Sequence, residues 1–173
     1  NLDYEGKKII TMTAHRRENL GQPLENICKA VARIVEEFDD VEVVYTVHKN
    51  PAVREIATRI LGGYDAVHLI EPLEMKDMHN LMKRSYLVLT DSGGLQEEVP
   101  SLGKPVVVLR NVTERPEGVD AGTLKMAGIE EEDIYHATKE LLTDQELYTK
   151  MAQAKNPFGD GNGRVSRALL NWM

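Results

Sequence analysis

The chain has 173 residues, of which 42% are hydrophobic and 28% are charged, so it can bury the core of one domain and is not disordered in composition. Its net charge of −7 argues against a nucleic-acid-binding surface, which needs a basic face. Its only cysteine, Cys28, excludes an internal disulfide, and no apolar run reaches the roughly 18 residues of a membrane span. We therefore expect a cytoplasmic protein with neither nucleic acid nor membrane as a partner.

β-Branched apolar segments alternate with helical patterns along the chain, with short links between them. Strands are predicted over 7–14, 41–47, 66–70, 86–90 and 104–109, and 122–128 is a candidate for a short sixth strand. Helices are predicted over 22–38, 51–61, 74–84, 94–102, 130–142 and 144–155, and in the tail at 163–173. This alternation predicts one Rossmann-like α/β domain over residues 1–173, with a doubly wound, mostly parallel sheet.

Two segments stand apart from this pattern. Residues 110–121, "RNVTERPEGVDA", show no periodicity, and a patternless stretch of this length in a compact domain is usually functional. The first residues, "NLDY", lack a methionine and run almost directly into a strand, so we expect the chain to be a piece of a longer polypeptide. Cys28 lies among the apolar positions of the first helix, which predicts a buried structural thiol.

Polar residues follow each of the first five predicted strands. In an open α/β sheet, ligands bind beyond the carboxyl ends of the strands, so we expect these residues to share one rim. They are the segments 15–19 ("HRREN"), 48–50 ("HKN"), 71–73 ("EPL"), 91–94 ("DSGG") and 110–115 ("RNVTER").

Ser92, Gly93 and Gly94 come where the fourth strand turns into a helix. Glycines let the backbone approach a ligand, and a helix start presents free N–H groups to an anion such as a phosphate. Ser92 could cap the helix and also donate to a phosphate oxygen, although an ordinary capped turn would have the same sequence. Glu97 and Glu98 follow one turn later, either as solvated carboxylates or, for Glu98 in particular, as an acceptor for the two hydroxyls of a ribose.

Four other residues on the rim could contact an anion. His15 precedes a charged run and could donate to a phosphate or act as an acid, while Arg115 is either a phosphate ligand or a partner of Glu114 or Glu117. His48 and Lys49 carry the same ambiguity. His68 and His79 receive no role. The sequence contains no metal-ligand cluster, no GxGxxG and no Walker A pattern.

The blocks "TAHRREN", "VHKNP", "LTDSGGLQEE" with "PSLGKPV", and "LRNVTERPEGVDAGT", taken together and in this order, resemble the non-hydrolysing UDP-N-acetylglucosamine 2-epimerases. The similarity extends to "NPFGDGNGRVSRAL", across essentially the whole chain. It implies one half of a GT-B fold, namely the C-terminal, nucleotide-binding domain of an enzyme about twice as long. That enzyme would interconvert UDP-N-acetylglucosamine and UDP-N-acetylmannosamine, for cell-surface polysaccharide synthesis, without metal or nicotinamide.

The resemblance also implies roles for particular residues. Ser92, Gly93, Gly94 and Arg115 would hold the diphosphate, Glu98 would take the ribose hydroxyls, and His15 would assist the departure of UDP. Arg16 and His48 would belong to a neighbouring site for a second, activating UDP-N-acetylglucosamine. Met78 lies in the segment that usually covers the uracil, at a place where an aromatic residue is common in the family.

The N-terminal domain, which would carry most of the acid and base carboxylates, is outside this sequence. We therefore expect the 173 residues to bind UDP weakly and not to epimerise, and we expect homodimers only of the longer protein. Two other readings stay open: a GT-B glycosyltransferase donor domain or hydrolysing epimerase, and a stand-alone module that senses UDP-sugars. The first would not be expected to combine "HRREN" with "TERPE".

Overall fold

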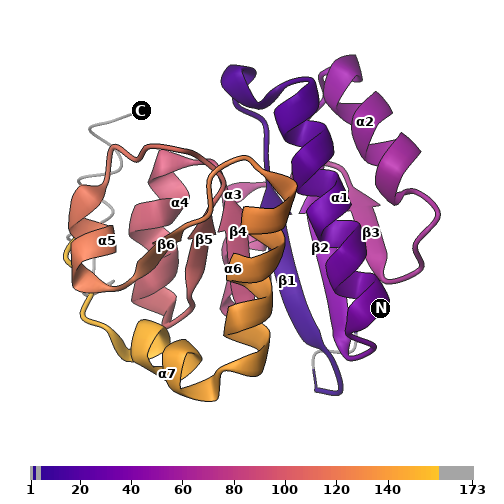
Figure 1. The fold of residues 1–173 in the computed structure, drawn as a ribbon. Coiled ribbons are helices and arrows are strands. Elements are labelled where there is room, and N and C mark those ends of the chain that lie inside the picture. The colour runs from indigo at the N-terminus through magenta and orange to yellow at the C-terminus, as the bar shows by residue number, and fades with distance from the viewer. Residues whose placement is uncertain (1, 3–4, 160–173) are drawn as a thin grey trace.

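The computed structural model describes residue 2 and residues 5–159, and the helix predicted at 163–173 lies outside them. Six strands form one parallel sheet in the order β3-β2-β1-β4-β5-β6 (Figure 1). The strands are β1 (Lys8–Thr13), β2 (Val41–Thr46), β3 (Val67–Ile70), β4 (Leu87–Thr90), β5 (Val106–Val108) and β6 (Leu124–Met126). The predicted parallel α/β sheet is confirmed, including its short sixth strand.

Helices cover both faces of this sheet, with α1, α2 and α6 on one face and α3 and α4 on the other (Figure 1). The α-helices are α1 (Gln22–Glu37), α2 (Pro51–Leu61), α3 (Met75–Lys83), α4 (Gly93–Glu98), α5 (Pro116–Ala121), α6 (Glu131–Thr143) and α7 (Gln145–Gln153). Two short 3₁₀ helices, η1 (Arg17–Asn19) and η2 (Val99–Leu102), precede α1 and follow α4.

The central strands β1, β4 and β5 are buried on both sides, which explains why they consist mostly of apolar residues. Alternate residues of β1 point to opposite faces: Ile10 packs in the cluster with α1 and α6, and Ile9 packs against Leu81 of α3. The predicted apolar face of α1 is buried, and Cys28 within it is fully buried, as expected for a structural thiol.

Residues 110–121 show no periodicity in the sequence, but their second half has regular structure. Residues 116–121 form helix α5, with Pro116 at its first position and Gly122 just past its end in a left-handed conformation, φ +84°. Proline at the start and glycine after the end are ordinary helix boundaries. A six-residue helix spans fewer than two turns, so its apolar periodicity is too short to recognise in sequence.

The strand order reverses between β1 and β4. The chain runs outward from β1 through β2 to β3 and then crosses back to β4, so β1 and β4 are neighbours whose following loops diverge. Ligands of doubly wound sheets bind in the crevice at such a reversal. Among the described residues, no helix is long and apolar enough to cross a lipid bilayer.

Candidate functional site

A cavity of about 240 Å³ lies at the carboxyl edge of the sheet, where the loops after several strands meet. It brings together four residues predicted to form the site, His15, His48, Met78 and Ser92, which come from four separate segments. Its lining residues are Thr13, His15, Thr46, His48, Pro72, Leu73, Met78, Ser92 and Leu95. The rim expected from the sequence therefore exists, and part of it is concave.

Two imidazoles stack in this cavity. The ring centroids of His15 and His48 are 5.7 Å apart, and the ring planes differ by 26°. A hydrogen bond within its own loop orients the ring of His48, because Nδ1 accepts from the backbone N–H of Asn50 at 3.1 Å. Two residues predicted for separate sites, the catalytic His15 and the activating His48, are thus direct neighbours.

The loop that carries His15 is anchored by a buried carboxylate, to which the sequence pattern assigns no role. Asp91, at the end of β4, is fully buried, and its Oδ2 accepts hydrogen bonds from the backbone N–H groups of His15 and Arg16, each at 3.0 Å. The side chain of Asn19 donates to the same oxygen at 3.0 Å and to the carbonyl of Leu109 at 3.1 Å. One acid therefore fixes the loop after β1 to the end of β4.

Helix α4 begins at the predicted anion-binding turn. Ser92 occupies the N-cap position in extended conformation, φ −87° and ψ 126°, but its side chain makes no capping bond. Its backbone N–H donates instead to Thr90 Oγ1 at 2.9 Å. The cap position is thus as predicted, while the predicted capping by the Ser92 hydroxyl is not observed in this structure.

Arg115 lies beside the first residue of α4. A β-carbon at Gly93 would be 3.4 Å from Arg115 Nη2, an ordinary van der Waals contact, so the guanidinium lies directly beside the helix start. Positive side chains at a helix N-terminus add to the partial positive charge of its free N–H groups. Pairing with Glu114 or Glu117 is the alternative to a phosphate-binding role for Arg115; it does contact Glu114, 3.7 Å from Nη1 to Oε2, but its nearest carboxylate is that of Glu97.

The two successive glutamates of α4 have different partners. Glu97 is buried and accepts a hydrogen bond from Arg115 Nε, so it is not a solvated carboxylate. Glu98 is more exposed, and its Oε1 lies 3.1 Å from Nδ1 of His79 on α3. His79, which receives no role from the sequence, therefore contacts the residue predicted to bind ribose.

Arg16 belongs to a separate cluster of charges next to the cavity. Its Nε donates to Glu18 Oε1 at 2.8 Å, and the same oxygen lies 3.5 Å from Nη2 of the largely buried Arg110. A backbone hydrogen bond to Glu18, followed by the Arg16 guanidinium, holds the pKa of the Glu18 carboxyl below its usual range. The cluster therefore keeps two cations at the rim around one ionised acid.

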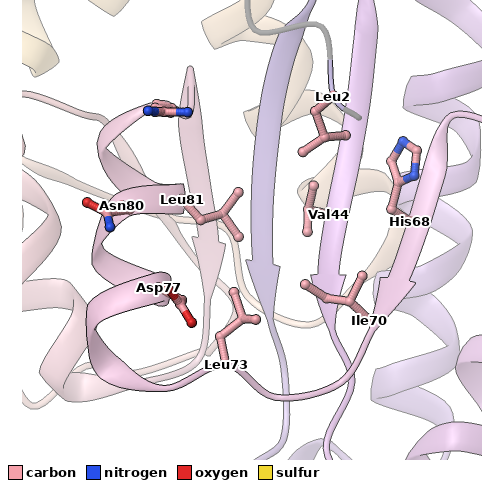
Figure 2. Close-up of a pocket in the computed structure, with 9 residues that line it drawn as sticks. Leu2, Val44, His68, Ile70, Leu73, Asp77, Asn80 and Leu81 are labelled. Atoms are coloured by element: carbon pink, nitrogen blue, oxygen red, sulfur yellow. The ribbon is translucent and has the colours of Figure 1, made fainter.

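A second cavity, of about 330 Å³, lies on the α3 face of the sheet and is distinct from the site (Figure 2). Figure 2 shows Leu81 extending from α3 toward Val44 of β2, with Leu2 and Ile70 further along the same face of the sheet. The two cavities share Leu73, in the link between β3 and α3. The larger cavity contains none of the residues predicted for the site.

Among the residues that the structure describes, no three His, Cys, Asp or Glu side chains gather in a group that could hold a metal ion.

Comparison with known proteins assigns the chain to a family. The family model described as UDP-N-acetylglucosamine 2-epimerase matches residues 1–169. The chain belongs to the UDP-N-acetylglucosamine 2-epimerase family. The resemblance carried by the four sequence blocks is thereby confirmed.

Individual relatives agree with this assignment. The chain is 64% identical over 172 residues to the UDP-N-acetylglucosamine 2-epimerase of Bacillus subtilis (strain 168), covering 98% of this chain and 45% of that protein. It is 48% identical over 167 residues to the enzyme of the same name from Escherichia coli (strain K12), covering 95% and 44%. The chain thus spans about half the length of the curated relatives it matches.

Solved structures extend the comparison to three dimensions. A co-structure of S. aureus MnaA with UDP superposes with a TM-score of 0.91 at 55% identity, covering 98% of this chain and 48% of that one. A UDP-GlcNAc 2-epimerase from Neisseria meningitidis bound to UDP-GlcNAc gives a TM-score of 0.88 at 44% identity, covering 95% and 45%. The expected fold class is confirmed, and the roles of individual residues stay predictions.

Proposed function

We propose that this chain is the UDP-binding half of an enzyme that interconverts UDP-N-acetylglucosamine and UDP-N-acetylmannosamine. One observation carries the proposal: the cavity at the sheet reversal gathers His15, His48, Met78 and Ser92 in a chain that belongs to the epimerase family. A relative of closely similar structure was solved with UDP, which supports the same ligand here. By its likeness to the family, the chain would form the C-terminal half.

The diphosphate would lie at Ser92, Gly93 and Gly94. There the first N–H groups of α4 and the guanidinium of Arg115 both offer positive charge, and donors to an oxyanion form strong hydrogen bonds. His15 lines the same cavity as Ser92, which suits a donor to the departing diphosphate.

The nucleoside would extend along α4 toward α3. Glu98, on the more exposed side of α4, would accept the two ribose hydroxyls, and Met78 of α3 would cover the uracil by apolar contact. Arg16 and His48 would hold a second, activating UDP-N-acetylglucosamine. Because His48 stacks on His15, the reacting and activating nucleotides would occupy adjoining spaces.

The chemistry would be an elimination followed by an addition. A base removes the proton from C2 of the sugar, and the C1–O bond breaks with its electron pair leaving on UDP, which gives a 2-acetamidoglucal. UDP then adds back at C1 while C2 receives a proton on the opposite face. The residues described here would bind UDP and stabilise its negative charge as it leaves.

The acid and base at C2 are proposed to lie on the other half of a longer protein. Since the chain spans 45% of its B. subtilis relative, we expect epimerisation, and association into homodimers, only from a protein that carries both halves. Its product would supply cell-surface polysaccharide synthesis. The isolated chain should bind UDP weakly and should not convert UDP-N-acetylglucosamine, as followed by proton NMR of the sugar.

Titration calorimetry of the chain with UDP tests the binding. Glu98→Ala should lower the affinity for UDP roughly ten- to hundredfold, because the loss of a charged acceptor leaves ribose hydroxyls unpaired. Glu117→Ala, at an exposed position in the first turn of α5, is the matched control and should leave affinity unchanged. Absence of UDP binding at millimolar concentration, both in this chain and in a two-domain protein containing it, would overturn the proposal.

A further inference from the structure

Glu97 is a buried acid in α4 whose carboxylate faces an arginine rather than solvent. Its side chain is 9% exposed, and the Arg115 side chain that donates to it from Nε is 11% exposed. An ion pair removed from water is costly unless both groups are well matched, so a pair this buried at the rim of a site requires an explanation.

The backbone of Arg115 is attached to the same helix by a second contact. The N–H of Arg115 donates to Thr113 Oγ1 at 2.9 Å, and that hydroxyl donates to Oε1 of Gln96 at 2.6 Å. Gln96 is fully buried and directly precedes Glu97. Successive residues of α4 therefore hold first the backbone and then the side chain of Arg115.

These contacts determine where the guanidinium lies. With Nε bonded to Glu97 and Nη1 3.3 Å from the carbonyl oxygen of Glu114, the plane of the group is fixed beside Gly93. An unrestrained arginine would lose rotamer freedom on meeting a ligand, and fixing it beforehand removes that cost from binding.

We propose that Glu97 is a positioning residue, which acts through Arg115 and sets its guanidinium for the diphosphate at Ser92–Gly94. The inference rests on the proposed function, because it takes UDP as the ligand. Glu97 would contact no part of the nucleotide. Its neighbour Glu98 would touch the ribose directly, so two adjacent glutamates would serve different parts of one ligand.

The alternatives make different predictions for two ligands. If Glu97 were itself a ribose ligand, its loss would weaken uridine as much as UDP. If it were only structural, its loss would lower stability and leave both affinities unchanged. If Glu97 acts by positioning Arg115, its loss would lower the affinity for UDP and leave the affinity for uridine unchanged, because uridine has no phosphate.

The experiment compares Glu97→Gln with Glu98→Gln in the whole chain, with UDP and uridine titrated by NMR chemical shifts, which register weak binding. Glu97→Gln should lower the affinity for UDP roughly tenfold or more and leave the affinity for uridine unchanged. Glu98→Gln should lower the affinities for both ligands by similar factors. Equal losses for both ligands in Glu97→Gln, or no loss for either, would overturn the proposal.

A double-mutant cycle tests whether Glu97 acts through Arg115. In an Arg115→Gln background, Glu97→Gln should cause no further loss of UDP affinity, because its route of action is already gone. Losses that multiply in the double variant would overturn the positioning role. Urea unfolding of each variant identifies any that fails to fold.

Failure of the proposed function has a different signature. A folded wild-type chain that binds neither UDP nor uridine would contradict nucleotide binding itself. If the wild type and Glu97→Gln bind UDP with equal affinity, only the positioning role is contradicted.

The Nε–H resonance of Arg115 adds a readout without ligand. It should exchange slowly with water in the wild type and in Glu98→Gln, and rapidly in Glu97→Gln; rapid exchange in the wild type would overturn the fixed geometry.

Discussion

Asp91 Oδ2 accepts hydrogen bonds from the backbone N–H groups of His15 and Arg16 at the same distance, 3.0 Å. The acid directly follows β4 and the two donors follow β1, so the contact joins the neighbouring strands at which the sheet order reverses. Two residues predicted to serve different nucleotides thus take their positions from one buried carboxylate.

Replacing Asp91 by alanine should destabilise the fold and loosen this loop. Three donors would lose their shared acceptor within a buried region, and leaving buried donors unsatisfied costs about 2–3 kcal/mol in the free energy of unfolding. UDP affinity should fall as well, because His15 would lose its fixed backbone. Urea unfolding and UDP titration measure the two effects.

Asp65→Ala is the matched control for this prediction. Asp65 is exposed in the loop before β3, so its replacement should change the free energy of unfolding by no more than about 0.5 kcal/mol. A value for Asp91→Ala within that same range would show that the loop does not depend on Asp91.

The sheet could be predicted from sequence because most residues of its strands are apolar and each strand is bounded by a helix or turn. The rim could be predicted as well, since parallel strands place their carboxyl ends together once the topology is known. His15, His48 and Ser92, which follow three of the strands, therefore share a cavity, and Met78 of α3 lines the same cavity.

The contacts between particular side chains could not be predicted from the sequence in the same way. Glu97 and Glu98 are adjacent and chemically identical, yet one is buried against Arg115 and the other faces His79. Which side of α4 each occupies depends on how α4 packs between the loop at 110–115 and α3, and sequence spacing does not contain that information. An acid directly after a mostly apolar strand, as at Asp91, is the signal in the sequence that could have indicated an anchoring role, because a buried polar group needs hydrogen-bond partners.

Cys28 gives a prediction that depends on pH. Burial raises the pKa of its thiol to about 12, from an ordinary value of 9.0. The unfolded chain releases this proton as the pH passes about 9, while the folded chain keeps it, so the free energy of unfolding should fall as the pH rises from 9.0 toward about 12.

Urea unfolding of the wild type and of Cys28→Ala, between about pH 8 and about pH 9.5, isolates the contribution of the thiol because tyrosines ionise at higher pH. The alanine variant should be less stable throughout but should lose less stability over this range. The native thiol should also react with a thiol reagent only after unfolding. Rapid reaction of the folded chain would contradict its burial.

His79 should orient the carboxylate of Glu98 for the ribose. Its Nδ1 lies 3.1 Å from Glu98 Oε1, across the gap between α3 and α4, and a bond of this kind contributes a modest amount when partly exposed. His79→Ala should therefore lower the affinity for UDP roughly three- to tenfold, a smaller loss than that expected for Glu98→Ala.

The same substitution in a Glu98→Ala background should have no effect on UDP affinity, because the group that His79 orients is absent. His136→Ala is the control, since His136 is an exposed histidine on α6 that pairs with Glu132 at 3.4 Å, far along the chain from the site. A loss for His79→Ala that persists without Glu98 would mean that His79 contacts the nucleotide itself, and the role of Glu98 would then need its own explanation.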